Sequence, residues 1–190
     1  MSADQTPELL RLPDLWLLSD ARNDAALERS LAALPPGSGF VFRHYHLGEG
    51  ERRTRFVALA ALARARGHLV LLSGDPARAQ EWGADGVYGS PERIAGASTL
   101  AVATAHDEAE IAAAASAGAQ AVMLSPVFAT RSHPAGEALG PTRFHALARL
   151  SSLPVIALGG MDAARARELG WPRWAAIDGL TAAPDPSRNA

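Results

Sequence analysis

Short apolar runs alternate with stretches rich in alanine, arginine and glutamate along nearly the whole chain. This alternation is typical of repeated strand–helix units, whose strands lie parallel in one sheet. There are eight such runs, and eight units favour a closed (β/α)8 TIM barrel over an open doubly wound sheet. We expect strands at Leu15–Leu18, Phe40–His44, Leu69–Ser73, Gly86–Tyr88, Thr99–Ala103, Ala121–Leu124, Val155–Ala157 and Ala175–Ile177.

The chain has 190 residues, whereas such barrels usually have about 250. The connection 89–98 has room for about one turn of helix, and the final segment TAAPDPSRNA is too rich in proline for a full helix. We therefore expect a compact barrel whose last helix is short or missing. The other helices are expected at Ala25–Leu34, Glu51–Arg66, Pro76–Trp82, Glu108–Ala117, Thr142–Leu150 and Ala163–Leu169.

The length fits a single domain over residues 1–190. A missing last helix would expose the outer face of the first and last strands. Trp171, Trp174 and the apolar N-terminal segment are candidates to cover that face. A second copy of the chain is another, which would make the protein a homodimer.

Composition excludes several functions. The net charge of −2 and the scattered arginines give no basic stripe for nucleic acid. The chain has no cysteine, so disulfides, thiolate metal sites and a cysteine nucleophile are excluded. There is neither a signal-like apolar segment nor an apolar run of about 18 residues, so we expect a cytoplasmic protein without a membrane partner.

Groups suited to binding phosphate follow two of the expected strands. The strand AVML runs into a polar loop, and the strand VIA is followed by two glycines before a helical stretch. Hydroxyls and cations donate hydrogen bonds to an anion, and glycines let the backbone approach it. The candidate residues for phosphate binding are Thr130, Arg131, Ser132, His133, Gly159 and Gly160.

The segments SPVFATRSHP…LG and PVIALGGM resemble the GPVFPTxTK…LG and PVxAIGGI motifs of the thiamine phosphate synthase and TenI family. The resemblance implies a barrel of thiamine biosynthesis that binds small phosphorylated molecules. The family reaction couples hydroxymethylpyrimidine pyrophosphate with thiazole phosphate and is assisted by Mg²⁺. In the TenI branch a histidine before VF is associated with thiazole tautomerisation, but Pro126 stands there in this chain.

The second expected strand places Val41, Arg43 and Tyr45 on one face by alternation. An arginine inside a barrel costs free energy unless it meets a ligand anion or a structural carboxylate, and both alternatives remain open. The family has VQLREK here, with the glutamine, arginine and lysine facing the pyrophosphate substrate. The resemblance therefore implies a catalytic role for Arg43 and puts Tyr45 in the place of the lysine.

The resemblance also locates the family's metal site. Ser73 takes the place of an asparagine and Gly74 that of an Mg²⁺-binding aspartate, while Tyr88 replaces a histidine and Arg93 a second aspartate. Because Mg²⁺ requires oxygen ligands, we expect no metal site and no cofactor. The neighbouring Asp75 and Glu92 fit a helix N-cap and a surface charge better than a metal site.

Thr104 and His106 alternate onto one face at the end of the fifth expected strand and match the family's Ser-x-His. His106 fits either a general acid/base or a brace for the following helix. In the loop, Thr130, Ser132 and His133 match the Thr, Thr and Lys of PTxTK, and Arg131 is a candidate to supply the lost permanent cation.

Asp178 stands at or next to a serine that surrounds the phosphate in the family. A carboxylate about 4 Å from a phosphate is repelled by roughly 1–4 kcal/mol. Asp178 therefore turns away, pairs with Arg43 or Arg131, or marks a protein that binds phosphate differently from its relatives.

Three functions remain in view. The first is an enzyme of thiamine biosynthesis whose synthase turnover is weak or lost with the metal aspartates. The second is a non-catalytic barrel that binds a thiamine-related or other small anionic ligand. The third is a different enzyme that uses His106, Tyr45 and Asp178 as acid/base groups, which requires the three to meet in one pocket.

Overall fold

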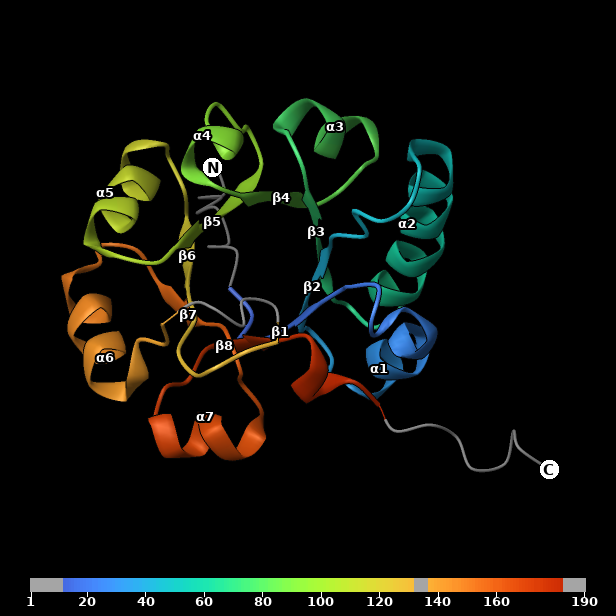
Figure 1. The fold of residues 1–190 in the computed structure, drawn as a ribbon. Coiled ribbons are helices and arrows are strands. Elements are labelled where there is room, and N and C mark those ends of the chain that lie inside the picture. Colours follow the sequence, from blue (N-terminus) through green and yellow to red (C-terminus); the bar gives the residue numbers. More distant parts are fainter. Residues whose placement is uncertain (1–11, 132–136, 183–190) are drawn as a thin grey trace, which may run out of the picture.

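The computed structural model describes residues 12–131 and 137–182. Within them, eight parallel strands close into a barrel in sequence order, with β8 beside β1 (Figure 1). The predicted (β/α)8 barrel is confirmed. The strands are β1 (Leu15–Leu18), β2 (Gly39–Phe42), β3 (Leu69–Ser73), β4 (Gly86–Gly89), β5 (Leu100–Ala105), β6 (Ala121–Leu124), β7 (Val155–Ala157) and β8 (Trp174–Ala176).

Helices surround the barrel, as expected for parallel strands that are buried on both faces. The short fourth helix confirms the single turn expected there. The helices are η1 (Asp24–Ala26), α1 (Leu27–Ala33), α2 (Glu49–Arg64), α3 (Pro76–Glu81), α4 (Pro91–Ile94), α5 (Glu108–Ser116), α6 (Gly140–Leu150), α7 (Ala163–Leu169) and η2 (Asp178–Leu180).

Two predicted strands differ most from the structure: β2 ends at Phe42 and not at His44, and β5 ends at Ala105 and not at Ala103. His44 has φ = +39°, which lies outside the extended region, so the strand cannot continue through it. β1, β3, β6 and β7 have the predicted bounds.

Two apolar layers stabilise the barrel. Alternate strand residues, among them Trp16, Val41 and Met123, fill its interior together with Leu12. The other set, among them Phe42 and Leu124, packs outward against the helices. The two layers follow from the period of two along each strand.

The outer face between β1 and β8 is covered by α1 and by the segment after β8. Within the described residues that segment forms only the 3-10 helix η2, in agreement with a short last helix. Leu180 packs against the outer layer, and the Ala182 N–H donates to Ser30 Oγ of α1 at 2.9 Å. Trp171 does not cover this face, because it packs edge-on against Phe144 of α6, with ring centroids 5.3 Å apart.

No helix among the described residues combines the length and the apolar character that crossing a bilayer requires.

Candidate active site

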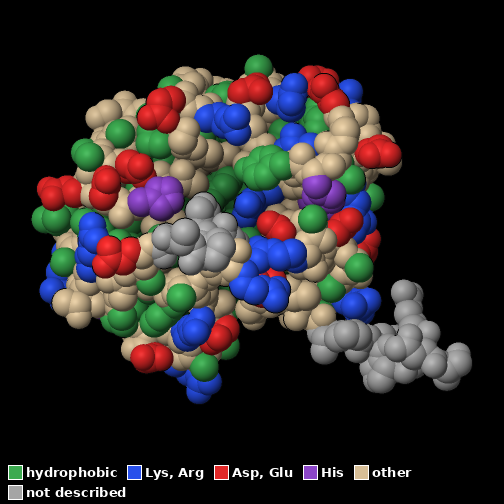
Figure 2. Space-filling view, viewed as in Figure 1, with side chains coloured by type: hydrophobic (Ala, Val, Ile, Leu, Met, Phe, Trp, Pro, Cys, Tyr) green, Lys and Arg blue, Asp and Glu red, His purple; other side chains and the backbone are tan. Residues whose placement is uncertain are grey.

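A cavity of about 430 Å³ opens at the carboxyl ends of the strands, where barrel enzymes place their sites. Basic side chains gather around the centre of this face (Figure 2). The cavity brings together most of the predicted site residues, whereas Ser132 and His133 lie outside the described residues. Those in its wall are Arg43, Tyr45, Ser73, Tyr88, Thr104, His106, Thr130, Gly159, Gly160 and Asp178.

Arg43 and Tyr45 continue the inward face of β2 beyond the end of the strand. The Arg43 guanidinium lies 3.9 Å from Asp20 Oδ2, a long ion pair, and 5.4 Å from the centre of the Tyr45 ring. Arg43 thus has a structural carboxylate as a distant neighbour and also lines the cavity, where its contact with a ligand anion stays a prediction. Burial alone would raise the pKa of Asp20, but hydrogen bonds from Arg22 and the charges of Arg22 and Arg43 lower it. The Tyr45 hydroxyl is hydrogen-bonded to Ser73 Oγ.

Arg52 of α2 fixes the carboxyl ends of β2 and β3. Its Nε donates to the Arg43 carbonyl at 2.9 Å and its Nη2 to the Ser73 carbonyl at 2.6 Å. The guanidinium also lies 5.3 Å from the centre of the Trp82 ring, and burial is the main cause that lowers its pKa. The sequence analysis missed Arg52, although its spacing from the buried Phe56 and Leu59 places it on the inner face of the helix.

Behind Arg43 lies a buried chain of hydrogen bonds. Ser19 Oγ accepts from the Arg43 N–H at 2.7 Å and lies 2.8 Å from His44 Nδ1. His44 Nε2 is 2.8 Å from Asp24 Oδ1. A carboxylate only accepts, so Nε2 carries the proton and Nδ1 accepts from the Ser19 hydroxyl. Burial, partly offset by the hydrogen bond to Asp24, lowers the pKa of His44, so the chain positions Arg43 with a neutral imidazole.

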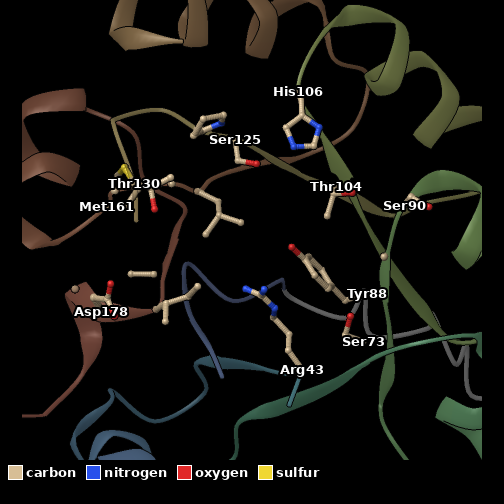
Figure 3. A pocket seen from close by; sticks show the side chains of 18 of the residues that line it. Arg43, Ser73, Tyr88, Ser90, Thr104, His106, Ser125, Thr130, Met161 and Asp178 are labelled. Atoms are coloured by element: carbon tan, nitrogen blue, oxygen red, sulfur yellow. The ribbon is translucent and has the colours of Figure 1, made fainter. Parts of the chain in front are cut away.

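Tyr88 of β4 points into the cavity towards Arg43 (Figure 3). Its side chain is 6 % exposed, and its hydroxyl has no hydrogen-bond partner among the described residues. Burial raises the pKa of Tyr88, so the phenol stays neutral and able to donate.

Thr104 and His106 both line the cavity, as the alternation of β5 predicts. His106 Nδ1 is 2.7 Å from Glu110 Oε2, one turn into α5. Asp107 caps the same helix by accepting from the Glu110 N–H. His106 therefore braces α5, and the same ring borders the cavity.

The wall formed by β6 and β7 consists largely of backbone. Gly159 and Gly160 have φ of +96° and +62°, and a Cβ on Gly159 would lie 2.5 Å from Pro126 Cα. The N–H groups of Val127 and Phe128 donate to the carbonyls of Leu158 and Gly159 across this contact. Only glycine fits there, which explains the Gly-Gly of the motif.

Asp178 lies at the β8 side of the mouth, and its side chain is 46 % exposed. Its Oδ2 is 3.4 Å from a guanidinium nitrogen of Arg22 and 3.4 Å from one of Arg131. Of the predicted alternatives, pairing with Arg131 is confirmed, whereas Arg43 pairs with Asp20. Arg131 therefore has Asp178 as a charge partner, and its role as a cation for phosphate stays a prediction.

The third function required Tyr45, His106 and Asp178 to meet in one pocket, and all three line this cavity, although each side chain is bonded to another residue. Their partners are Ser73, Glu110 and the two arginines respectively. No hydrogen bond or ion pair joins the three in the described part of the chain.

The cavity does not fit Mg²⁺. Among the described residues, Asp178 is the only carboxylate in its wall, and its ion pairs are with the guanidinium groups of Arg22 and Arg131. Asp75 caps α3 through the Arg78 N–H, as predicted, and Glu92 is exposed on α4. Elsewhere, Asp24, His44 and His46 have ligand atoms within 4.8 Å of one another, but Arg55 lies 2.7 Å from the same Asp24 oxygen.

The closed barrel defines the protein as a (β/α)8 barrel, with arginine, hydroxyls and glycine backbone in the wall of the cavity at its mouth. A family model described as thiamine monophosphate synthase matches residues 15–171, and the chain belongs to this family. The family predicted from the two motifs is thus confirmed, as is its place in thiamine biosynthesis.

Individual relatives agree with this assignment. The thiamine-phosphate synthase of Xanthomonas campestris pv. campestris is 30 % identical, over 95 % of this chain and 93 % of its own length. That of Chromobacterium violaceum is 34 % identical, over 90 % of this chain and 89 % of its own. The solved structure of thiamine phosphate pyrophosphorylase from Pyrococcus furiosus is similar with a TM-score of 0.72 and 21 % identity, covering 87 % of this chain and 85 % of that one.

Proposed function

We propose that this chain binds the thiazole phosphate substrate of thiamine phosphate formation in the mouth of its barrel. In the family reaction, the thiazole nitrogen attacks the pyrimidine carbon and pyrophosphate leaves. The names of the relatives and their coverage of nearly the whole chain support a ligand from this reaction.

The observation that carries the proposal is the composition of the cavity wall. Arg43 enters from β2, while Thr130 and the backbone of Gly159 and Gly160 come from the β6 and β7 side. A guanidinium gives strong, charge-assisted hydrogen bonds to a phosphate, and hydroxyls orient it. The volume of about 430 Å³ suits one small heterocycle with its phosphate.

Binding and turnover are separate in this proposal. The barrel would hold the reactants and place positive charge near the leaving group. The carboxylates that hold Mg²⁺ in the family are replaced, so we expect Mg²⁺-dependent synthase turnover to be weak or absent. The same replacement favours the second candidate, a barrel that binds a thiamine-related ligand without turnover.

Calorimetric titration of the purified full chain with thiazole phosphate tests the proposal. We expect saturable binding that Arg43→Ala or Thr130→Ala weakens at least tenfold. Arg149→Ala, which removes an exposed arginine of α6 outside the cavity, is the matched control and leaves the affinity unchanged. No binding with or without Mg²⁺ and pyrophosphate would exclude thiazole phosphate, and robust Mg²⁺-dependent product formation would contradict the expected loss of turnover.

A further inference from the structure

Arg93 is a second arginine in the cavity wall, and it comes from α4 on the side of β4. Its aliphatic stem lies along Gly89, where a Cβ would be 3.2 Å from Arg93 Cδ. Because Gly89 has no side chain, the stem of Arg93 fits beside the mouth of the barrel. The Arg93 guanidinium makes no hydrogen bond or ion pair within 4.0 Å among the described residues, although its charge is felt by Asp75, whose pKa it helps to lower.

Arg43 and Tyr88 face the same part of the cavity from β2 and β4 (Figure 3). Among the described residues, the carboxylate that pairs with Arg43 is 3.9 Å away, and the Tyr88 hydroxyl makes no hydrogen bond to another described residue. Because Tyr88 points into the cavity, its hydroxyl can donate to an acceptor of a bound ligand.

The charge on this side of the mouth suits an anion with more than one phosphate. Arg43 and Arg93 contribute two positive charges, and no carboxylate from β2, β3, β4 or α4 lines the cavity. Each guanidinium can bond to two phosphate oxygens at once. The same two charges repel a divalent cation, which would need carboxylate or water oxygens.

We propose that Arg43 and Arg93, with the Tyr88 hydroxyl, form a subsite that binds a diphosphate group directly and without a divalent metal ion. Arg93 then holds the diphosphate itself. This inference rests on the proposed function and deepens it, because diphosphate is the leaving group of the family reaction. The new element is that Arg93, at the position where the family resemblance puts a metal-binding aspartate, binds the diphosphate itself.

The test is titration of the full chain with inorganic pyrophosphate, once with EDTA and once with Mg²⁺. We expect saturable binding in EDTA, and equal or weaker binding in Mg²⁺ because the metal competes for the phosphate oxygens. Arg93→Ala weakens binding in EDTA at least tenfold, Arg93→Lys weakens it less, and Arg149→Ala leaves it unchanged. Circular dichroism melts verify that each variant is folded.

Binding that requires Mg²⁺, or an Arg93→Ala variant with unchanged affinity, would overturn the subsite. The titration with pyrophosphate tests the subsite, and the titration with thiazole phosphate tests the proposed function, so the two proposals can fail separately. If pyrophosphate binds in EDTA and thiazole phosphate does not, the proposed function fails and the subsite stands. If only thiazole phosphate binds, the subsite fails alone.

Discussion

The two halves of the barrel mouth are built in different ways. On the side of β2, β3 and β4, the cavity wall consists of side chains, among them Arg43, Tyr88 and Arg93. On the side of β6, β7 and β8, glycine backbone at Gly159, Gly160 and Gly179 forms much of the wall. Side chains of the first half can be replaced without a clash with the barrel backbone, whereas a Cβ at Gly159, Gly160 or Gly179 would lie within 2.6 Å of backbone atoms. The glycine positions are therefore the part of the mouth that tolerates substitution least.

The largest effect should come from adding one methyl group to the backbone half. Gly159→Ala places a Cβ against Pro126 and forces alanine to a φ of +96°, so we expect a loss of roughly 2–5 kcal/mol in the free energy of unfolding. Gly170→Ala is the matched control, because Gly170 has a φ of +63° with no atom within 4 Å of a Cβ, and should cost about 1–2 kcal/mol. Urea denaturation measures the free energy of unfolding of both variants. Equal losses in the two variants would show that close packing at Gly159 does not restrict the β6, β7 and β8 side of the mouth.

A smaller loss of stability is expected behind the side-chain half. Arg52→Met keeps the apolar stem but removes the bonds to the Arg43 and Ser73 carbonyls, at a cost of roughly 2–3 kcal/mol. It should also weaken phosphate binding, because the ends of β2 and β3 lose their common donor. Arg53→Ala removes an exposed pair with Glu81 and should cost under about 1 kcal/mol. Urea denaturation measures the stability of both variants, and calorimetric titration measures their affinity for phosphate. If Arg52→Met and Arg53→Ala had equal stability and equal affinity, this role for Arg52 would be contradicted.

The smallest effect on stability is expected at Asp178. Asp178→Asn breaks exposed ion pairs, so unfolding should change by under about 1 kcal/mol. Removing the negative charge should tighten phosphate binding by about 1 kcal/mol, or roughly fivefold in Kd. Asp14→Asn, which breaks an exposed pair with Arg173 just before β1, is a control of equal charge. An unchanged or weaker affinity in Asp178→Asn would show that this carboxylate does not oppose the ligand.

The fold could be predicted because each strand is a short apolar run with a clear end, and half of the strands have their predicted bounds. The cavity wall could be predicted where strand alternation continues into the mouth, as at Thr104 and His106. Apart from the pair of Asp178 with Arg131, which was one of several alternatives, contacts between distant segments could not be predicted. Nothing in the sequence pairs Asp178 with Arg22, or places Ser19 between Arg43 and His44, because such contacts depend on how the loops pack in space.

The pairing of β8 with β1 has a consequence for how the chain folds. Every other pairing joins strands that follow each other in the sequence, so those contacts can form while the chain is still being made. The contact of Leu15 with Trp174 joins opposite ends of the described chain and closes by far the longest loop. Until β8 emerges from the ribosome, the nascent sheet therefore has two open edges that can pair with another chain. The three residues of β8 close the sheet between β7 and β1, and a truncation before Trp174 would leave both of these edges exposed.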